Sequence, residues 1–262
     1  MNKKIIFFDI DGTLLDEHTG KIPESTKQSI KLAQENGHIL IVNTGRPIST
    51  IDTAVTEIGF DGYICGCGTY IEYQNKPILH ATLDETIRLE VIRQAYKCNV
   101  QAVLEGKQGA FFPINTTHPL ILNFKEIYNQ QGLPTGEYEM NDLIDYDKLA
   151  VWYNKDSDIE TFKNFLKRYF EIIQRDHDFI EVVPLGYSKA TGIQFLIDYL
   201  NINIEDTISI GDSTNDLSML EYTKESIAMG NSNPLLFDKV TYVTTDVDKD
   251  GILNALKHYH II

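Results

Sequence analysis

Short apolar runs alternate with amphipathic stretches along the chain and predict an α/β fold. Residues 5–8, 38–42 and 207–210 are largely apolar, which is typical of strands buried on both faces of a parallel sheet. A helix is predicted between the first two runs, beginning at Ile22-Pro23-Glu24 and ending at Asn36-Gly37. Strand, helix and strand in this order form a βαβ unit, so we expect a parallel sheet.

The pattern changes near Thr82 and returns near Tyr187. Between these points short strands alternate with long helices, which are predicted at residues 84–97, 119–130 and 158–170. This mixture is typical of an α+β domain. After it, Ser188 caps a further helix, and strands follow at residues 207–210, 226–229 and 242–244. We therefore expect a core of residues 1–82 and 187–262, interrupted by an inserted domain of residues 83–186.

Composition and charge narrow the possible functions. The chain has 262 residues, of which 42% are hydrophobic and 23% charged, as expected for a globular protein. The net charge of −15 argues against a nucleic-acid or anionic-membrane surface, either of which needs a basic patch. No apolar stretch has the length of a membrane span. Three cysteines form no disulfide pattern, which suits a reducing cytoplasm.

Polar side chains follow three of the predicted strands. The carboxyl ends of parallel strands meet at one edge of a sheet, so we expect these side chains to lie together. Carboxylates gathered in this way form the all-oxygen site that Mg²⁺ prefers, and a divalent cation explains how an acidic protein binds an anion. The side chains, with one lysine at the start of a helix, are Asp9, Asp11, Thr44, Gly45, Arg46, Lys189, Asp212, Asn215 and Asp216.

Phosphoryl transfer needs this set of groups. One carboxylate can attack phosphorus, a second can protonate the leaving oxygen, and a metal, a lysine and a hydroxyl can stabilise charge on the other oxygens. Each group also has a simpler explanation. Asp11-Gly12 and Thr44-Gly45 are ordinary turn sequences, Lys189 alone fits an exposed lysine, and residues 211–216 fit a helix-capping loop. Their occurrence together in this order favours phosphoryl transfer.

Four ordered motifs resemble those of the haloacid dehalogenase (HAD) superfamily, and their spacing resembles its Cof-like phosphatase branch. They are DIDGT at residues 9–13, NTGRP at 43–47, Lys189 before a helix, and GDSTNDLSML at 211–220. The resemblance implies a Rossmann-like core with a large inserted α/β cap. It also implies Mg²⁺-dependent hydrolysis of small phosphorylated metabolites, such as sugar phosphates.

The resemblance further implies a role for each matching residue. Asp9 is then the nucleophile and Asp11 the general acid and base, while Thr44 and Lys189 hold the phosphoryl group. The implied substrate-binding residues are Thr44, Gly45, Arg46, Lys189 and Asn215, and the implied metal residues are Asp9, Asp11, Asp212 and Asp216. The chain departs from the family pattern at Cys67-Gly68, where relatives often have Asn-Gly, and at Ala190, where Gly is common.

Two other functions are compatible with these motifs. A phosphomutase of the same superfamily returns the phosphoryl group to a sugar, and release of inorganic phosphate distinguishes a phosphatase from it. A binding module that kept the fold without catalysis is the other alternative. The presence of both Asp9 and Asp11 argues against such a module, which has no chemical need for the pair.

Overall fold

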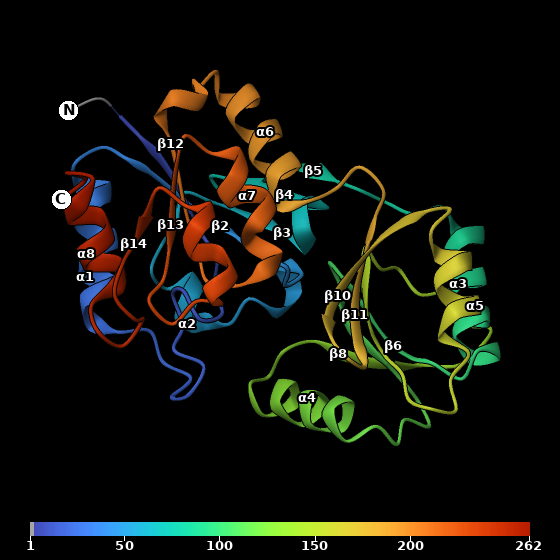
Figure 1. The fold of residues 1–262 in the computed structure, drawn as a ribbon. Helices are drawn as coiled ribbons and strands as arrows, with labels where there is room; N and C mark the ends of the chain where they lie inside the picture. Colours follow the sequence, from blue (N-terminus) through green and yellow to red (C-terminus); the bar gives the residue numbers. More distant parts are fainter. Residues whose placement is uncertain (1–2) are drawn as a thin grey trace. The chain divides into compact units, whose positions relative to one another are not determined.

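The structure is a computed structural model that describes residues 3–262, and it divides into two compact units (Figure 1). The core unit contains the residues up to Gly45 together with Thr53–Ile78 and Ser188–Ile262. The inserted unit contains Arg46–Asp52 and Leu79–Tyr187. The predicted core range included residues 46–52, but this segment belongs to the inserted unit. One reason is that Ser49 Oγ donates a hydrogen bond of 2.6 Å to the carbonyl of Gly106.

An eight-stranded sheet forms the centre of the core unit, in the order β14-β13-β12-β1-β2-β3-β4-β5. Strand β1 (Ile5–Phe8) lies between β2 (Ile39–Asn43) and β12 (Thr207–Gly211) and is parallel to both. The chain leaves β1 towards β2 on one side and later returns to β12 on the other. The carboxyl end of β1 is therefore a topological switch point, where open α/β sheets bind their ligands. The remaining strands are β3 (Gly62–Cys65), β4 (Tyr70–Tyr73), β5 (Lys76–His80), β13 (Glu225–Ala228) and β14 (Tyr242–Val243).

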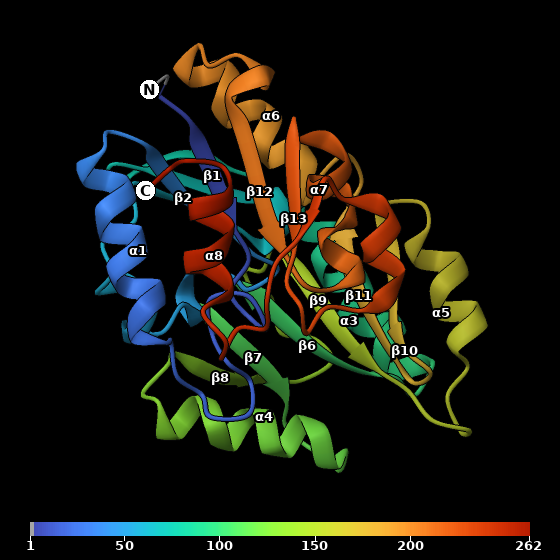
Figure 2. The same ribbon diagram turned by 60° about the vertical axis from the view of Figure 1, so that its left-hand side comes forward.

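Helices cover both faces of this sheet. Figures 1 and 2 show α1 (Glu24–Glu35) and α8 (Gly251–His258) side by side on one face, with α6 (Lys189–Leu200) and α7 (Leu217–Tyr222) on the other. Both layers bury apolar side chains against the strands, and β1 and β2 are buried throughout. This explains why the strands read as continuous apolar runs rather than as alternating ones.

The inserted unit has its own six-stranded sheet, in the order β10-β11-β9-β6-β7-β8. Helices α3 (Glu85–Lys97) and α5 (Ile159–Leu166) pack on one face, and α4 (Pro119–Gln130) packs on the other. Strand β9 serves both cores, because its side chains point alternately to the two faces. The strands are β6 (Gln101–Gly106), β7 (Gly109–Pro113), β8 (Thr135–Tyr138), β9 (Lys148–Trp152), β10 (Phe170–Asp176) and β11 (Phe179–Pro184).

Several elements differ from the sequence-based expectation. The helix expected at residues 158–170 ends at Leu166, where a turn closes with Tyr169 N–H donating to the Leu166 carbonyl, and β10 begins at Phe170. Behind the loop at Arg46 there is only a 3₁₀ turn (Ile48–Thr50) and the short α2 (Thr53–Thr56). Strands β8 and β10 and helix α8 were not predicted. No helix within residues 3–262 is long and apolar enough to cross a membrane.

Candidate active site

Asp9 lies at the switch point, directly after β1, and only 4% of its surface is exposed. Its backbone N–H donates to the carbonyl of Ile210 in the adjacent strand β12, at 3.0 Å. The ammonium group of Lys189, at the first position of α6, lies 2.7 Å from Asp9 Oδ1 and 2.5 Å from Asp216 Oδ1. The structure therefore brings together three predicted site residues from three distant parts of the chain.

Asp216 organises the loop that follows β12. It is fully buried, and its second oxygen, Oδ2, accepts the backbone N–H groups of Asp212 and Ser213, both at 2.9 Å. The adjoining backbone is tightly packed, because a Cβ atom at Gly211 would lie 2.6 Å from the Asp216 carboxyl carbon. Asp216 thus holds Asp212 in place while it pairs with Lys189.

Three carboxylates converge at this point: oxygens of Asp9, Asp212 and Asp216 all lie within 4.8 Å of one another. Burial, and then repulsion from Asp216, raises the pKa of Asp9 to about 7, although Lys189 opposes the shift. Burial, followed by repulsion from Asp9 and Asp216, raises the pKa of Asp212 to about 8. Burial alone would lower the pKa of Lys189, but its two carboxylate partners raise it overall, so the lysine stays charged.

This donor set fits a hard divalent cation. Lys189 pairs with two of the three clustered carboxylates, Asp9 and Asp216, so one ammonium does not fully compensate the negative charge of the cluster. Carboxylate oxygens are the ligands that Mg²⁺ prefers, and a divalent charge would remove the repulsion that raises the two pKa values. Asp11 was predicted to join the metal set through its backbone carbonyl, and this stays a prediction, since the side-chain cluster described within residues 3–262 consists of Asp9, Asp212 and Asp216.

The loop after Asp9 is fixed from the other side of the site. Gly12 has a φ of +74°, and a Cβ atom there would lie 2.4 Å from Asp212 Oδ2, so the position requires glycine. Asn231 clamps this loop: its Nδ2 donates to the Gly12 carbonyl at 2.8 Å, and its Oδ1 accepts from Val247 N–H at 2.8 Å. Asn231 was assigned no role from the sequence, although it lies in the loop that follows β13 (Glu225–Ala228), and this position was a usable signal.

The other predicted site residues have different local surroundings. Thr44 is buried, and its backbone bonds to the Ile64 carbonyl at 2.9 Å and to Cys67 N–H at 3.1 Å. Gly45 follows it and is half-buried. Asn215 is half-buried and accepts a hydrogen bond of 2.5 Å from Ser213 Oγ. Arg46, by contrast, belongs to the inserted unit, where it pairs with Asp52 at 3.3 Å.

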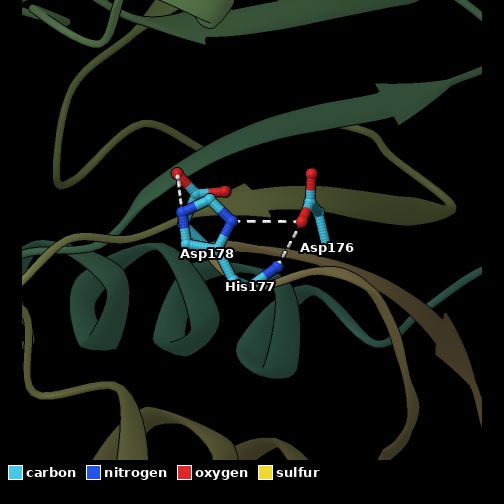
Figure 3. A group of neighbouring side chains, drawn as sticks. All are labelled: Asp176, His177 and Asp178. Carbon is cyan, nitrogen blue, oxygen red and sulfur yellow. Dashed lines mark hydrogen bonds and ion pairs between the residues drawn. The ribbon is translucent and has the colours of Figure 1, made fainter.

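A second group of potential metal ligands, Asp176, His177 and Asp178, lies at the turn between β10 and β11 (Figure 3). His177 is 83% exposed, and its two ring nitrogens lie 3.1 Å from Asp176 and 3.5 Å from Asp178. Both nitrogens are therefore already occupied by carboxylates. We interpret this group as a surface ion-pair cluster.

Comparison with known proteins agrees with this geometry. The family model for haloacid dehalogenase-like hydrolases matches residues 6–256. The chain belongs to this family. It is 30% identical over 267 residues to the putative phosphatase YkrA of Bacillus subtilis (strain 168), with both chains covered completely. It is 27% identical to the 5-amino-6-(5-phospho-D-ribitylamino)uracil phosphatase YitU of the same organism, over 97% of each chain.

Solved structures give the same relationship. The HAD subclass IIB sugar phosphatase BT4131 superimposes with a TM-score of 0.83 at 27% identity, covering 99% of this chain and 100% of that one. The expected HAD-like α/β fold is confirmed. This HAD-family chain is an enzyme, a phosphoric monoester hydrolase. Phosphatases of its superfamily generally use a divalent metal.

Proposed function

We propose that the protein is a Mg²⁺-dependent phosphatase that hydrolyses small phosphorylated metabolites, sugar phosphates or similar compounds, through an aspartyl-phosphate on Asp9. The observation that carries the proposal is the placement of Asp9 at the switch point of the sheet, held by Lys189 beside Asp212 and Asp216. Two of the three similar proteins support a sugar-like substrate, because YitU acts on a phosphorylated ribityl compound and BT4131 is a sugar phosphatase.

In the first step a carboxylate oxygen of Asp9 attacks phosphorus, and the bond from phosphorus to the leaving oxygen breaks. Asp11 gives its proton to that oxygen, so that an alcohol leaves rather than an alkoxide. The ammonium group of Lys189 and the hydroxyl of Thr44 stabilise charge on the remaining phosphoryl oxygens, and Asn215 supports them.

In the second step water attacks the aspartyl-phosphate, and Asp11, now ionised, takes a proton from that water. The bond between phosphorus and Asp9 breaks, which restores the carboxylate and releases inorganic phosphate. Lys189 lies against Asp9 and partly balances the negative charge that returns to it.

The metal would be held by the carboxylates of Asp9, Asp212 and Asp216, with the backbone carbonyl of Asp11. When bound, Mg²⁺ neutralises charge on the phosphoryl oxygens and on the acidic cluster itself. Its presence would also keep Asp9 ionised at neutral pH, because a nearby cation favours the charged form of a carboxyl group.

We further propose that the inserted unit, predicted as residues 83–186, selects the substrate, with Arg46 contributing from the loop after Thr44. Its separate sheet and its two cores support this role as an independent domain. The working compartment in this proposal is the cytoplasm, which suits the three free cysteines.

The decisive experiment is a screen of phosphorylated metabolites with detection of inorganic phosphate, run with and without Mg²⁺. A phosphatase releases one phosphate for each substrate consumed. A phosphomutase would instead convert one sugar phosphate into an isomer without stoichiometric phosphate release. The Asp9→Asn variant provides the blank, because it retains the fold but lacks the nucleophile.

A further inference from the structure

Asn43, the last residue of β2, connects three elements of the core unit. Its side chain is completely buried, and Nδ2 donates a hydrogen bond of 3.1 Å to the backbone carbonyl of Lys189 at the start of α6. The same nitrogen lies 3.6 Å from Sδ of Met219 in α7, three residues after Asp216. One amide group thus joins the strand that leads into Thr44 to the helices next to Lys189 and Asp216.

The orientation of this amide is determined by Lys189. If the amide were reversed, its oxygen would face the Lys189 carbonyl, and two acceptors cannot bond to each other. In the observed orientation Asn43 Oδ1 is buried and has no hydrogen-bond partner among residues 3–262. An unsatisfied buried acceptor destabilises a fold, whereas an apolar side chain of similar shape would avoid this cost.

Packing alone therefore does not explain an asparagine at this position. The four preceding residues of β2, Ile39 to Val42, are all apolar and buried, so the environment favours another apolar side chain. The hydrogen bond to Lys189 is the interaction that only a donor can make here. Because the Oδ1 of Asn43, unpaired within residues 3–262, costs stability, the presence of asparagine here indicates that its hydrogen bond to Lys189 serves the site.

We propose that Asn43 is a positioning residue that fixes the backbone of Lys189, so that the lysine ammonium reaches Asp9 and Asp216. The inference rests on the proposed function, in which Lys189 stabilises the phosphoryl group. Asn43 itself touches neither Asp9 nor Asp216 in this assignment; it acts through Lys189. Displacing a catalytic group by about 1 Å can cost on the order of 10²-fold in rate, so loss of this anchor has a measurable effect.

The test replaces Asn43 with leucine, which has the same branching but no donor. We expect kcat to fall about 10- to 100-fold while KM changes by less than about 3-fold, because misplacing Lys189 affects the reacting state more than ground-state binding. Thr26→Val is the matched control. Thr26 Oγ1 is also buried and has no hydrogen-bond partner in the described part of the chain, but it lies in α1, and its loss should leave kcat unchanged.

A double variant separates positioning from a general structural role. If Asn43 acts through Lys189, adding Asn43→Leu to Lys189→Met should lower kcat by less than about 2-fold further. Multiplicative losses, or an unchanged kcat in Asn43→Leu, would overturn the inference. Where the leucine variant does not fold, as judged by circular dichroism, Asn43→Ala removes the same donor without overpacking and is judged by the same criteria.

The outcomes also distinguish this inference from the proposed function. Full activity in Lys189→Met would mean that the role assigned to the lysine is wrong, whatever Asn43 does. A large loss in Lys189→Met with no loss in Asn43→Leu would leave the proposed function intact and reject only the positioning role. A crystal structure of Asn43→Leu should show Lys189 Nζ displaced from its 2.7 Å contact with Asp9.

Discussion

The ammonium group of Lys189 lies 2.7 Å from Oδ1 of Asp9, although 180 residues separate the two in the chain. The whole inserted unit lies between them in the sequence. The ion pair is nevertheless almost completely buried, so neither charge is balanced by water. The site is therefore complete only when both halves of the core unit have folded together. Its charges should accordingly affect the stability of the folded protein, which can be measured.

Metal removal should make stability depend on pH in a defined direction. The pKa values of Asp9 and Asp212 rise from 3.8 to about 7 and about 8 in the metal-free fold, so the folded chain binds their protons more tightly than the unfolded chain does. Folding then takes up protons between roughly pH 4 and 8, and the metal-free protein loses stability as pH rises through this window.

Thermal melts in a chelator at pH 5 and pH 8 measure this effect, and repeating them with Mg²⁺ completes the experiment. We expect the melting temperature without metal to be lower at pH 8, and Mg²⁺ to raise it more at pH 8 than at pH 5, because only ionised carboxylates bind the metal. The Asp212→Asn variant should show a shallower dependence. An Mg²⁺ effect of equal size at both pH values would count against the carboxylate site.

Gly12→Ala should damage the site more than its backbone strain alone explains. A Cβ atom at Gly12 would lie 2.4 Å from Asp212 Oδ2, so the alanine must displace a carboxylate of the cluster. Gly20→Ala is the matched control, since Gly20 has a similar φ of +65° but, apart from its chain neighbours, nothing in residues 3–262 lies within 4 Å of the added Cβ. Both variants should lose about 1 kcal/mol of stability from the positive φ.

Only Gly12→Ala should also lower turnover and weaken activation by Mg²⁺. Titrating Mg²⁺ against initial rate in both variants gives the comparison. Equal Mg²⁺ activation curves for the two alanines would show that a Cβ atom at residue 12 does not displace the Asp212 carboxylate from the metal site.

In the inserted unit, Lys148→Met should be strongly destabilising. The Lys148 ammonium lies 2.6 Å from Glu105 and 2.8 Å from Glu181, and all three side chains are at most 10% exposed. The substitution removes the ammonium that pairs with both buried carboxylates, and breaking a buried ion pair typically costs about 3–5 kcal/mol. Urea denaturation followed by the fluorescence of Trp152, the single tryptophan and part of β9, reports directly on this unit.

Lys125→Met is the control for that measurement, because Lys125 lies in the same inserted unit as Trp152. Its ammonium pairs with Glu137, but the two side chains are 25% and 44% exposed, and such surface pairs contribute less than about 1 kcal/mol. Similar denaturation midpoints for the two variants would mean that burial does not govern the Lys148 cluster.

The residues after the parallel strands were predictable because strand direction places them at one edge. Asp9 and Asp216 were identified from apolar runs that end in polar residues, and the structure does bring them together with Lys189. Lys189 itself has no local signal of function. Its burial depends on contacts with two strand ends that no window of sequence contains, and only the ordered set of motifs indicated it.

The parts that were not predicted depend on tertiary contacts. Strand β8 is a short sequence, TGEY, with three of its four residues outside the buried core, so it carries no clear periodicity. The clamp by Asn231 joins Gly12 to Val247, residues more than 200 positions apart. The helix expected to reach residue 170 was instead predicted too long. Its aromatic pattern continues from α5 into β10, although the backbone turns at Leu166.

Asp9 and Asp11 should fail in different ways when each is changed to asparagine. Asp9→Asn replaces the anionic nucleophile with a neutral amide, so no aspartyl-phosphate can form and turnover should be abolished. Asp11→Asn keeps the nucleophile but removes the proton donor, and general acid–base catalysis is typically worth about 10²- to 10⁴-fold in rate. We expect a loss of that size in Asp11→Asn.

The leaving group distinguishes the two roles most sharply. An aryl phosphate releases a weakly basic phenolate that needs little protonation, whereas an alkyl phosphate releases a strongly basic alkoxide. The Asp11→Asn variant should therefore lose much less activity on the aryl substrate, while Asp9→Asn should be inactive on both. Turnover of both variants on both substrates, with circular dichroism to confirm folding, is the measurement. Substantial activity in Asp9→Asn would exclude the covalent mechanism, and equal losses on the two substrates in Asp11→Asn would remove its assignment as the general acid.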